Sequence, residues 1–275
     1  MRRAANQRGP YTENTMLRTI NATRYVLPLR EGGSLPAIVE ADDLGLYVVK
    51  FRGAGQGLLA LVAEVIAGEI GRALGLNVPE IVFIEIDAAL GRNEPDYEIR
   101  ELIKNSAGLN LALDYLPGST MFDPAARDTT TAEIASLAVW FDAFTQNVDR
   151  TARNANLLLW HRKLYFIDHG AALYFHHDWR SMPQKIESPF PEIAQHILLP
   201  WATEIPGAAA IAKERLTAPV LQEILNQVPD QWLQSADPAS DPAEIRSVYV
   251  EFFLRRLAAS TIFEEEAIRA HARLV

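Results

Sequence analysis

The chain has 275 residues, 49% of them hydrophobic and 22% charged, which is the balance of a globular protein. Its formal net charge of −9 excludes a general nucleic-acid-binding protein, because contact with the phosphate backbone requires a basic surface. The sequence contains no cysteine, so disulfides, thiolate catalysis and cysteine-ligated metals are excluded as well. No apolar run approaches the roughly 20 residues that cross a bilayer, and we therefore expect a cytoplasmic protein without a membrane span.

The first 17 residues carry several arginines among polar residues and lack the apolar segment of a secretory signal. We expect residues 1–17 to form a disordered leader. The folded part of the chain is then expected to begin at residue 18.

Short strands dominate the pattern that follows. Runs rich in β-branched and aromatic residues are separated by glycine and aspartate turns, which is typical of strands joined by turns. One segment among them has helical apolar spacing and ends at Gly75, which predicts a helix with a glycine stop. The expected strands are 25–29, 35–40, 46–51, 78–86 and 97–103, and the expected helix is 58–74. These elements predict a strand-rich N-lobe over residues 18–112.

In the second half of the chain, the spacing of the apolar residues changes and becomes mostly helical. Residues 111–118 have the composition of an extended connector, and we expect a hinge at 113–117. Thr130 and Glu133 form a capping box that opens an apolar helix. Two strands, at 156–160 and 164–167, and four helices, at 208–216, 220–228, 242–259 and 262–272, complete the expected elements. The sequence therefore predicts an α+β fold with two lobes, the second being a mostly helical C-lobe at 118–275.

The strongest candidate for a functional site combines a loop with a strand end. Asp149 stands five residues before Asn154, and Asp168 ends a predicted strand within an Asp-His-Gly sequence. This is the layout of a phosphoryl-transfer site, in which one carboxylate orients the acceptor hydroxyl while an amide and a second carboxylate hold Mg²⁺ on the nucleotide phosphates. Asp149 is the candidate for the first role, and Asn154 and Asp168 are the candidate metal ligands. Arg153 is a candidate for stabilising charge on the transferring group.

Lys50 ends the third predicted strand, where a lysine can direct its charge toward nucleotide phosphates from a rigid element. Such a lysine needs a carboxylate on the following helix to hold it. Glu64 and Glu69 both lie on the predicted helix, Glu69 nearer the centre of its apolar face and Glu64 nearer its flank. Helical spacing leaves both glutamates open as the partner of Lys50.

Two glycine clusters are candidates for contact with phosphates. Gly32-Gly33-Ser34 joins the first two strands, where a glycine-rich loop would cover a nucleotide. The second cluster, at 53–57, runs from a strand into a helix and superficially resembles a dinucleotide-binding fingerprint. Its third glycine comes one position early and no βαβ unit follows, so a turn leading into a helix explains it equally well.

At these residues the chain resembles the HipA-like kinases, bacterial relatives of protein and phosphoinositide kinases. The helix that contains Ala63-Glu64 and leads into Gly75-Leu-Asn-Val-Pro79 is similar to that family's Asn-Glu helix, which ends in Gly-Leu-x-Val-Pro. The stretch from Asn147 to Asn154 is similar to the family's catalytic loop. The sequence departs from the family at Thr151, where histidine is usual, and at Ala63, where asparagine is usual.

The resemblance implies a two-lobed protein-kinase-like fold that binds ATP with Mg²⁺ between its lobes. It implies transfer of the γ-phosphate to a hydroxyl, typically of a protein serine or threonine. It favours Glu64 over Glu69 as the partner of Lys50, and it implies that Asp114 and Leu116 present backbone groups to adenine.

Three other functions stay open at this point. A small-molecule or phosphoinositide kinase would carry the same motifs in the same order. A pseudokinase-type module would keep the fold and bind nucleotide or a partner without phosphate transfer. The hypothesis of a nicotinamide-dependent oxidoreductase is based on the glycines at 53–57 alone. The sequence does not identify the acceptor, the oligomeric state or a genetic partner.

Overall fold

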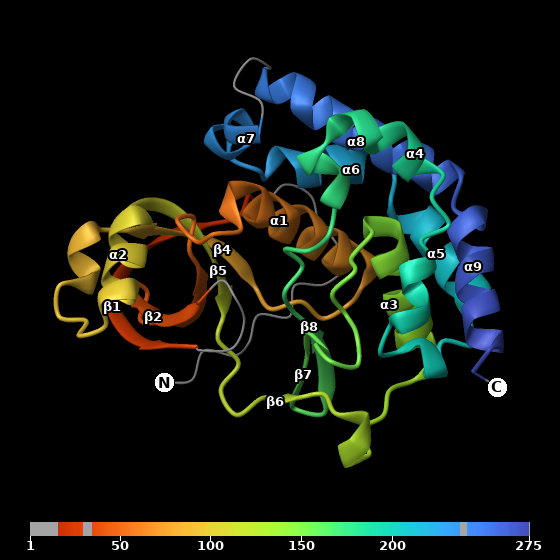
Figure 1. Ribbon diagram of the computed structural model, residues 1–275, viewed down its shortest axis with the longest axis horizontal. Helices are drawn as coiled ribbons and strands as arrows, with labels where there is room; N and C mark the ends of the chain where they lie inside the picture. The colour runs from red at the N-terminus through yellow and green to blue at the C-terminus, as the bar shows by residue number, and fades with distance from the viewer. Residues whose placement is uncertain (1–15, 30–34, 237–240, 275) are drawn as a thin grey trace.

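The computed structural model describes residues 16–29, 35–236 and 241–274 (Figure 1). Within these ranges the strands are β1 (Thr19–Pro28), β2 (Ala37–Ala41), β3 (Leu46–Lys50), β4 (Ile81–Ile86), β5 (Gly108–Asp114), β6 (Thr120–Met121), β7 (Leu157–Trp160) and β8 (Lys163–Phe166). The α-helices are α1 (Gly57–Leu74), α2 (Tyr97–Asn105), α3 (Ala132–Thr145), α4 (Met182–Ile186), α5 (Ile205–Arg215), α6 (Ala218–Asn226), α7 (Asp230–Ala236), α8 (Pro242–Ala258) and α9 (Thr261–Ala272). Strands are concentrated in the N-terminal part and helices in the C-terminal part, as the sequence predicts for a mixed α+β fold.

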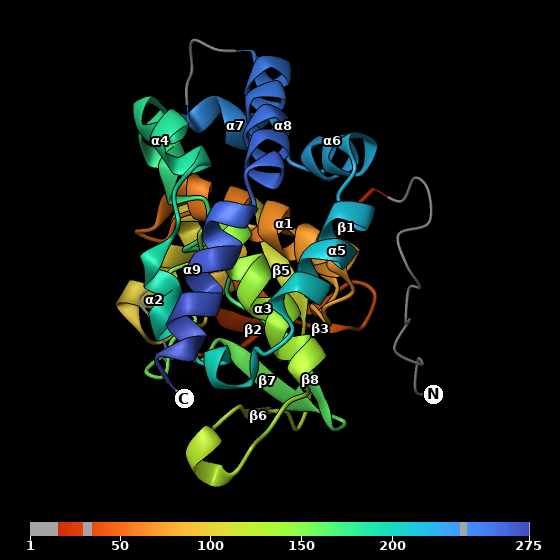
Figure 2. The same cartoon turned by 90° about the vertical axis from the view of Figure 1, so that its right-hand side faces the viewer.

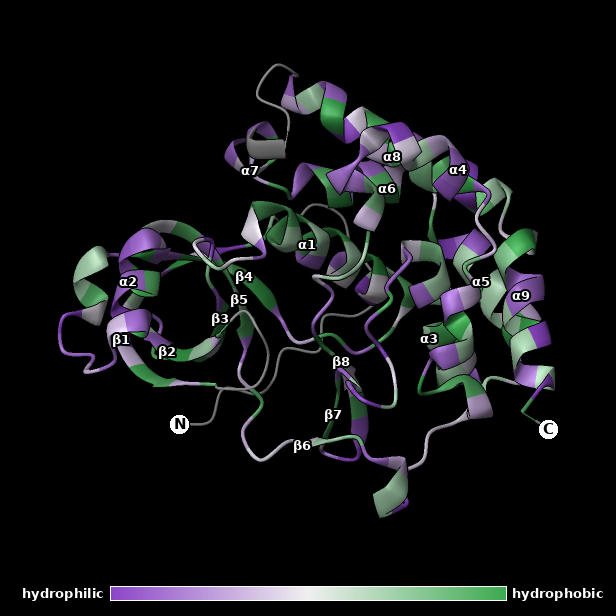
Figure 3. Cartoon of the chain, viewed as in Figure 1, coloured by the Kyte–Doolittle hydropathy of each residue, from purple (hydrophilic) through white to green (hydrophobic). Residues whose placement is uncertain are grey.

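The first five strands close into a barrel in the order β1-β2-β3-β5-β4. Parallel pairing of β1 with β4 closes it, and the other neighbours are antiparallel. Aliphatic side chains such as Val39, Val49 and Val82 are fully buried inside it. Figure 3 shows the hydrophobic colour along β4 and β5. β-Branched residues fill this interior because they pack well on a pleated surface, and Lys50 thereby stands at the end of a rigid strand.

The predicted strand at 97–103 is wrong, because these residues form the helix α2. Asp96 caps the helix, its side chain accepting a hydrogen bond from Glu98 N at 3.0 Å. Ile99 and Ile103 are spaced by one helical turn and are buried against the barrel core. These residues have β propensity, but their apolar members have helical spacing. A helix places them on one face, and that face packs against the barrel.

Two other expectations need correction. The first half of the expected connector at 111–118 belongs to β5, which pairs with both β3 and β4 and therefore lies inside the barrel sheet. The helix α3 is capped one residue later than predicted, since Thr131 rather than Thr130 accepts the hydrogen bond, from Ile134 N at 3.2 Å. Residues 1–15 of the expected leader and the whole Gly32-Gly33-Ser34 loop lie outside the described residues.

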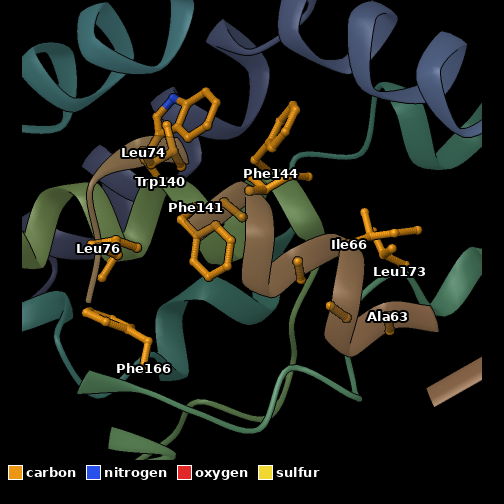
Figure 4. Packing of buried hydrophobic residues seen from close by; sticks show 14 of the residues in the cluster. Ala63, Ile66, Leu74, Leu76, Trp140, Phe141, Phe144, Phe166 and Leu173 are labelled. Atoms are coloured by element: carbon orange, nitrogen blue, oxygen red, sulfur yellow. The ribbon is translucent and has the colours of Figure 1, made fainter. Parts of the chain in front are cut away.

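The helix α1 ends at Leu74 with Gly75 as its C-cap, as the sequence predicts, and it runs through the centre of the molecule (Figure 1). The φ of Gly75 is 89°, which a side chain would oppose, and its N–H closes the helix by donating to Arg72 O. Figure 4 shows Ala63, Ile66 and Leu74 of α1 among the aromatic side chains of α3. Because α1 also packs against α5, α6 and α7, it is buried on nearly every side.

The predicted C-terminal helices are present as α5, α6, α8 and α9, each within a few residues of its expected bounds. Short helices α4 and α7 were not predicted. β6, β7 and β8 form a small sheet at the end of the molecule opposite α8 (Figures 1 and 2). Asn77 joins this sheet to the end of α1, since its Nδ2 donates to Leu164 O at 3.1 Å and its carbonyl accepts from Phe166 N at 2.8 Å. Within the described ranges, no helix combines the length and hydropathy needed to cross a bilayer.

Replacing Ile103 by alanine is expected to lower the free energy of unfolding by about 2–4 kcal/mol, because it leaves a cavity where α2 covers the barrel. The exposed neighbour Lys104 provides the control, and Lys104→Ala should change the free energy by less than about 0.5 kcal/mol. Urea denaturation followed by circular dichroism measures both. Equal effects of the two substitutions would contradict the burial of Ile103 against the barrel.

The stability of the fold should also depend on the neutral state of His176. Burial, with the nearby His177, lowers the pKa of His176 to about 3, and its Nδ1 lies 2.8 Å from the hydroxyl of Tyr249. The unfolded chain binds a proton there below pH ~6.5, whereas the folded chain does not. The free energy of unfolding should therefore fall by about 2 kcal/mol for this residue between pH 7 and pH 5. His176→Gln should remove this share of the pH dependence in urea titrations, and an unchanged slope would contradict the assignment.

Candidate active site

Three elements meet at the side chain of Lys50. Its ammonium donates to Glu64 Oε1 on α1 and to Asp168 Oδ1 after β8, the latter at 2.6 Å. The Glu64 side chain is only 1% exposed and also accepts a hydrogen bond from Gly170 N at 2.9 Å. The strand β3, the helix α1 and the Asp-His-Gly turn are therefore tied together by one cation and two carboxylates.

The structure distinguishes the two glutamates of α1. Glu64 contacts Lys50, whereas Glu69 faces away and forms an ion pair with Arg72 at 3.4 Å. Glu69 is 6% exposed, as its position near the centre of the apolar face predicts, but this burial does not bring it to Lys50.

Asp168 is distinguished by its charge state and by its backbone conformation. The ammonium of Lys50 lowers the pKa of Asp168 to about 2, so its carboxylate is ionised at neutral pH. Burial opposes the charge of Lys50, but Glu64 and Asp168 outweigh it and raise the pKa of the ammonium. Asp168 has a φ of 56°, in the left-handed region where a non-glycine residue costs on the order of 1 kcal/mol or more. Such strain is typical of functional positions.

The Asp149–Asn154 loop is tight and internally bonded. Thr151 and Asn154 exchange backbone hydrogen bonds of 2.9 and 3.2 Å. Asp149 Oδ2 accepts from Asn154 Nδ2 at 2.9 Å and from Asn156 Nδ2 at 3.2 Å. Within the part of the chain that the structure describes, no group donates to Asp149 Oδ1. The loop therefore holds one carboxylate oxygen in place and leaves the other available to a substrate hydroxyl.

A buried network that motif reasoning missed lies under this loop. Arg150, Asp142 and His196 are all buried, and Asp142 Oδ2 accepts from Arg150 Nε at 2.6 Å and from His196 Nε2 at 2.8 Å. Burial opposes the charge of Asp142, but Arg150 and His196 outweigh it and lower its pKa to about 2. A lone aspartate within the apolar stretch Trp140–Phe144 is the one signal in the sequence that pointed here. His196 carries no such signal, being 54 residues from Asp142.

The remaining predicted residues lie around these groups. Asp114 ends β5 beside β3, and burial together with the charge of Glu80 raises its pKa to about 6. The N–H of Leu116, two residues on, donates to no described backbone carbonyl. Arg153 is exposed in the Asp149 loop and forms no ion pair with any described residue.

The 53–57 glycine cluster forms a turn that opens α1. Gly53 N donates to the side chain of Ser106 at 3.1 Å, and Gly57 N donates to Ala54 O at 2.9 Å. A cavity beside this turn is lined in part by Lys50 and Glu64. α1 joins β3 to β4, but β5 lies between these strands and pairs antiparallel with both, so the glycines do not open a unit of two adjacent parallel strands as in a dinucleotide-binding fold.

The residues present fit a magnesium ion shared with a nucleotide. Since Asn154 Nδ2 donates to Asp149, the amide oxygen of Asn154 faces away from that bond, and Asp168 adds an ionised carboxylate that is 45% exposed. Among the described residues, no cluster of three or more histidine, aspartate or glutamate side chains forms an all-protein metal cage. Mg²⁺ typically takes one or two protein oxygens and completes its shell with water and phosphates. Asn154 and Asp168 are a donor set of that kind.

The comparison with known proteins adds to this geometry. The crystal structure of a Helicobacter pylori proinflammatory kinase, CtkA, is similar over 91% of this chain and 98% of that chain, with a TM-score of 0.55 and 13% sequence identity. At this identity the likeness shows a shared fold. No curated protein matches the chain. A family model described as HipA-like kinase matches residues 24–266, and the chain therefore belongs to the HipA-like kinase family.

Proposed function

We propose that this protein transfers the γ-phosphate of Mg-ATP to a hydroxyl, with a protein serine or threonine as the acceptor. Two observations carry this proposal: Lys50 joins Glu64 to Asp168, and Arg150 of the Asp149–Asn154 loop contacts both neighbours of Asp168. Membership of the HipA-like kinase family supports phosphoryl transfer. The choice of a protein acceptor rests on the sequence resemblance to that family.

The nucleotide is proposed to bind between the barrel and the helical part. Lys50, held by Glu64, anchors the phosphates. The backbone of Asp114 and the N–H of Leu116, which donates to no described backbone carbonyl, bind adenine. Gly32, Gly33 and Ser34, which lie outside the described residues, are proposed to cover the phosphates. Mg²⁺ held by Asn154 and Asp168 would neutralise charge on the phosphate oxygens.

The chemistry proposed for the loop is a single displacement. The acceptor hydroxyl oxygen forms a bond to the γ-phosphorus, while the bond from that phosphorus to the β,γ-bridging oxygen breaks and ADP leaves. Asp149 orients the hydroxyl through its unoccupied Oδ1 and accepts the proton. Arg153, exposed on the same loop, stabilises charge on the phosphoryl group as it moves.

Asp149→Ala is expected to lower the rate of phosphate transfer by about 100- to 10,000-fold, because it removes the group that orients and deprotonates the acceptor. Binding of Mg-ATP should change little, since Lys50 and Asp168 are left in place. Radiolabelled ATP with bacterial lysate proteins measures transfer, and calorimetry measures binding. Asp178→Ala, at an exposed aspartate that caps a short turn, is the matched control.

Equal transfer by wild type and Asp149→Ala would remove Asp149 from the mechanism. Label on a lipid or small molecule instead of a protein would identify the other kinase class. Stabilisation of the wild type by Mg-ATP without any transfer would favour a nucleotide-binding pseudokinase.

The two glutamates of α1 give a second prediction. Glu64→Gln should lower kcat/KM for ATP by about 10- to 100-fold, or about 1.4–3 kcal/mol of transition-state stabilisation, because Lys50 loses a charged partner. Glu69→Gln should leave kcat/KM within about twofold of the wild type, since Glu69 pairs with Arg72 and not with Lys50. Steady-state kinetics at varied ATP concentration tests both variants. A larger loss in Glu69→Gln would contradict the assignment of Glu64.

A further inference from the structure

Arg150, in the stretch that resembles a catalytic loop, has a side chain that points inward. Its side chain has no exposed surface, whereas Asp149 before it is partly exposed. The guanidinium lies over the ring of Phe166, 5.2 Å from its centroid. Burying a cation costs free energy unless it is paired with an anion and its donors are hydrogen-bonded. The partners of Arg150 therefore indicate its structural role.

The partners of Arg150 flank Asp168 on both sides. Nη1 donates to the carbonyl of Ile167 at 3.3 Å, and Nη2 lies 3.3 Å from Nδ1 of His169. Nη1 also donates to the carbonyl of Asn156, whose side chain donates to Asp149 Oδ2 at 3.2 Å. One planar group therefore contacts the residues before and after Asp168 and the residue that holds the Asp149 carboxylate.

Asp142 fixes the guanidinium from the other side. Its Oδ2 accepts Arg150 Nε, and its Oδ1 accepts Asn147 Nδ2 at 3.1 Å. Asn147 Oδ1 in turn accepts Asp149 N at 3.1 Å. Asp142 lies on α3 within the core. Its carboxylate therefore holds the Arg150 side chain directly and the Asp149 backbone through Asn147.

We propose that Arg150, oriented by Asp142, is a positioning residue that sets the Asp168 turn relative to the Asp149 loop. The inference rests on the proposed function, because Asp149 and Asp168 are the acceptor side and the metal side of that reaction. Arg150 itself does not touch substrate in this assignment. It acts by holding the strained Asp168 backbone between two hydrogen-bonded neighbours.

The test is Arg150→Lys, which keeps a positive charge for Asp142 but loses the planar fork that reaches Ile167, Asn156 and His169. The matched control is Arg256→Lys. Arg256 is also fully buried and donates to backbone carbonyls, of Phe144 at 2.9 Å and Lys185 at 2.8 Å, with no contact to either flank of Asp168. Both substitutions should lower the melting temperature.

Three readouts separate positioning from stability. These are the transfer rate per folded molecule, the affinity for ATP with and without Mg²⁺ by calorimetry, and amide hydrogen exchange of the ligand-free protein at residues 149–154 and 166–170. Arg150→Lys should lower the transfer rate by about 10- to 100-fold, weaken ATP binding only when Mg²⁺ is present, and raise exchange in both segments. Arg256→Lys should leave all three readouts near the wild type.

If Arg150→Lys fails to fold, His169→Phe is the second variant. It removes only the contact that Arg150 Nη2 makes with His169, and it should change the three readouts in the same direction by smaller amounts. Indistinguishable readouts for the Arg150 or His169 variant and the Arg256 control would overturn the inference while leaving the kinase proposal intact. A wild type that binds Mg-ATP without transferring phosphate would remove the proposed function. The Mg²⁺ dependence of ATP affinity and the exchange data would then still decide the role of Arg150.

Discussion

The buried contact between Lys50 and Glu64 is the constraint on which the rest of the arrangement depends. A carboxylate that is 1% exposed needs a cation and a donor at fixed positions, and Lys50 and Gly170 N supply them. β3, α1 and the turn after β8 must therefore converge on one point. The other contact of Lys50, to Asp168, then brings the end of β8 to the same place.

The position of Glu64 depends in turn on how α1 is packed. The helix lies between the barrel and the C-terminal helices, and Phe141 and Phe144 of α3 share its core (Figure 4). Arg215 at the end of α5 donates to Leu74 O at 2.5 Å, which ties the C-terminal end of α1 to the helical part. A helix buried in this way cannot shift without disrupting the core, so the packing of α1 holds Glu64 in place beside Lys50.

The two halves of the candidate site are built on different supports. Lys50 and Glu64 belong to the barrel and α1, whereas Asp149 and Asn154 are carried by a short loop after α3. A loop of this kind holds its geometry only when its backbone is anchored, and here the anchor is the buried carboxylate of Asp142 with Arg150 and His196. The polar network under the loop thus anchors it to the core, in addition to the hydrogen bonds within the loop.

The sequence by itself determined the periodic elements and the order of the motif residues. The helix α1 with its glycine stop, the C-terminal helices, and the candidates Lys50, Asp149, Asn154 and Asp168 followed from spacing and residue chemistry. The sequence favours a strand where α2 lies, because its residues have local β propensity. The helix is stabilised by packing of Ile99 and Ile103 against the barrel, a contact that the local sequence does not report. Helical spacing left Glu64 and Glu69 open, the family resemblance favoured Glu64, and the packed structure brings Glu64 to Lys50. The network of Asp142 and His196 depends on contacts between segments far apart in the chain. Periodicity reports which face of a helix is buried, but only the packed structure decides which buried group meets which partner.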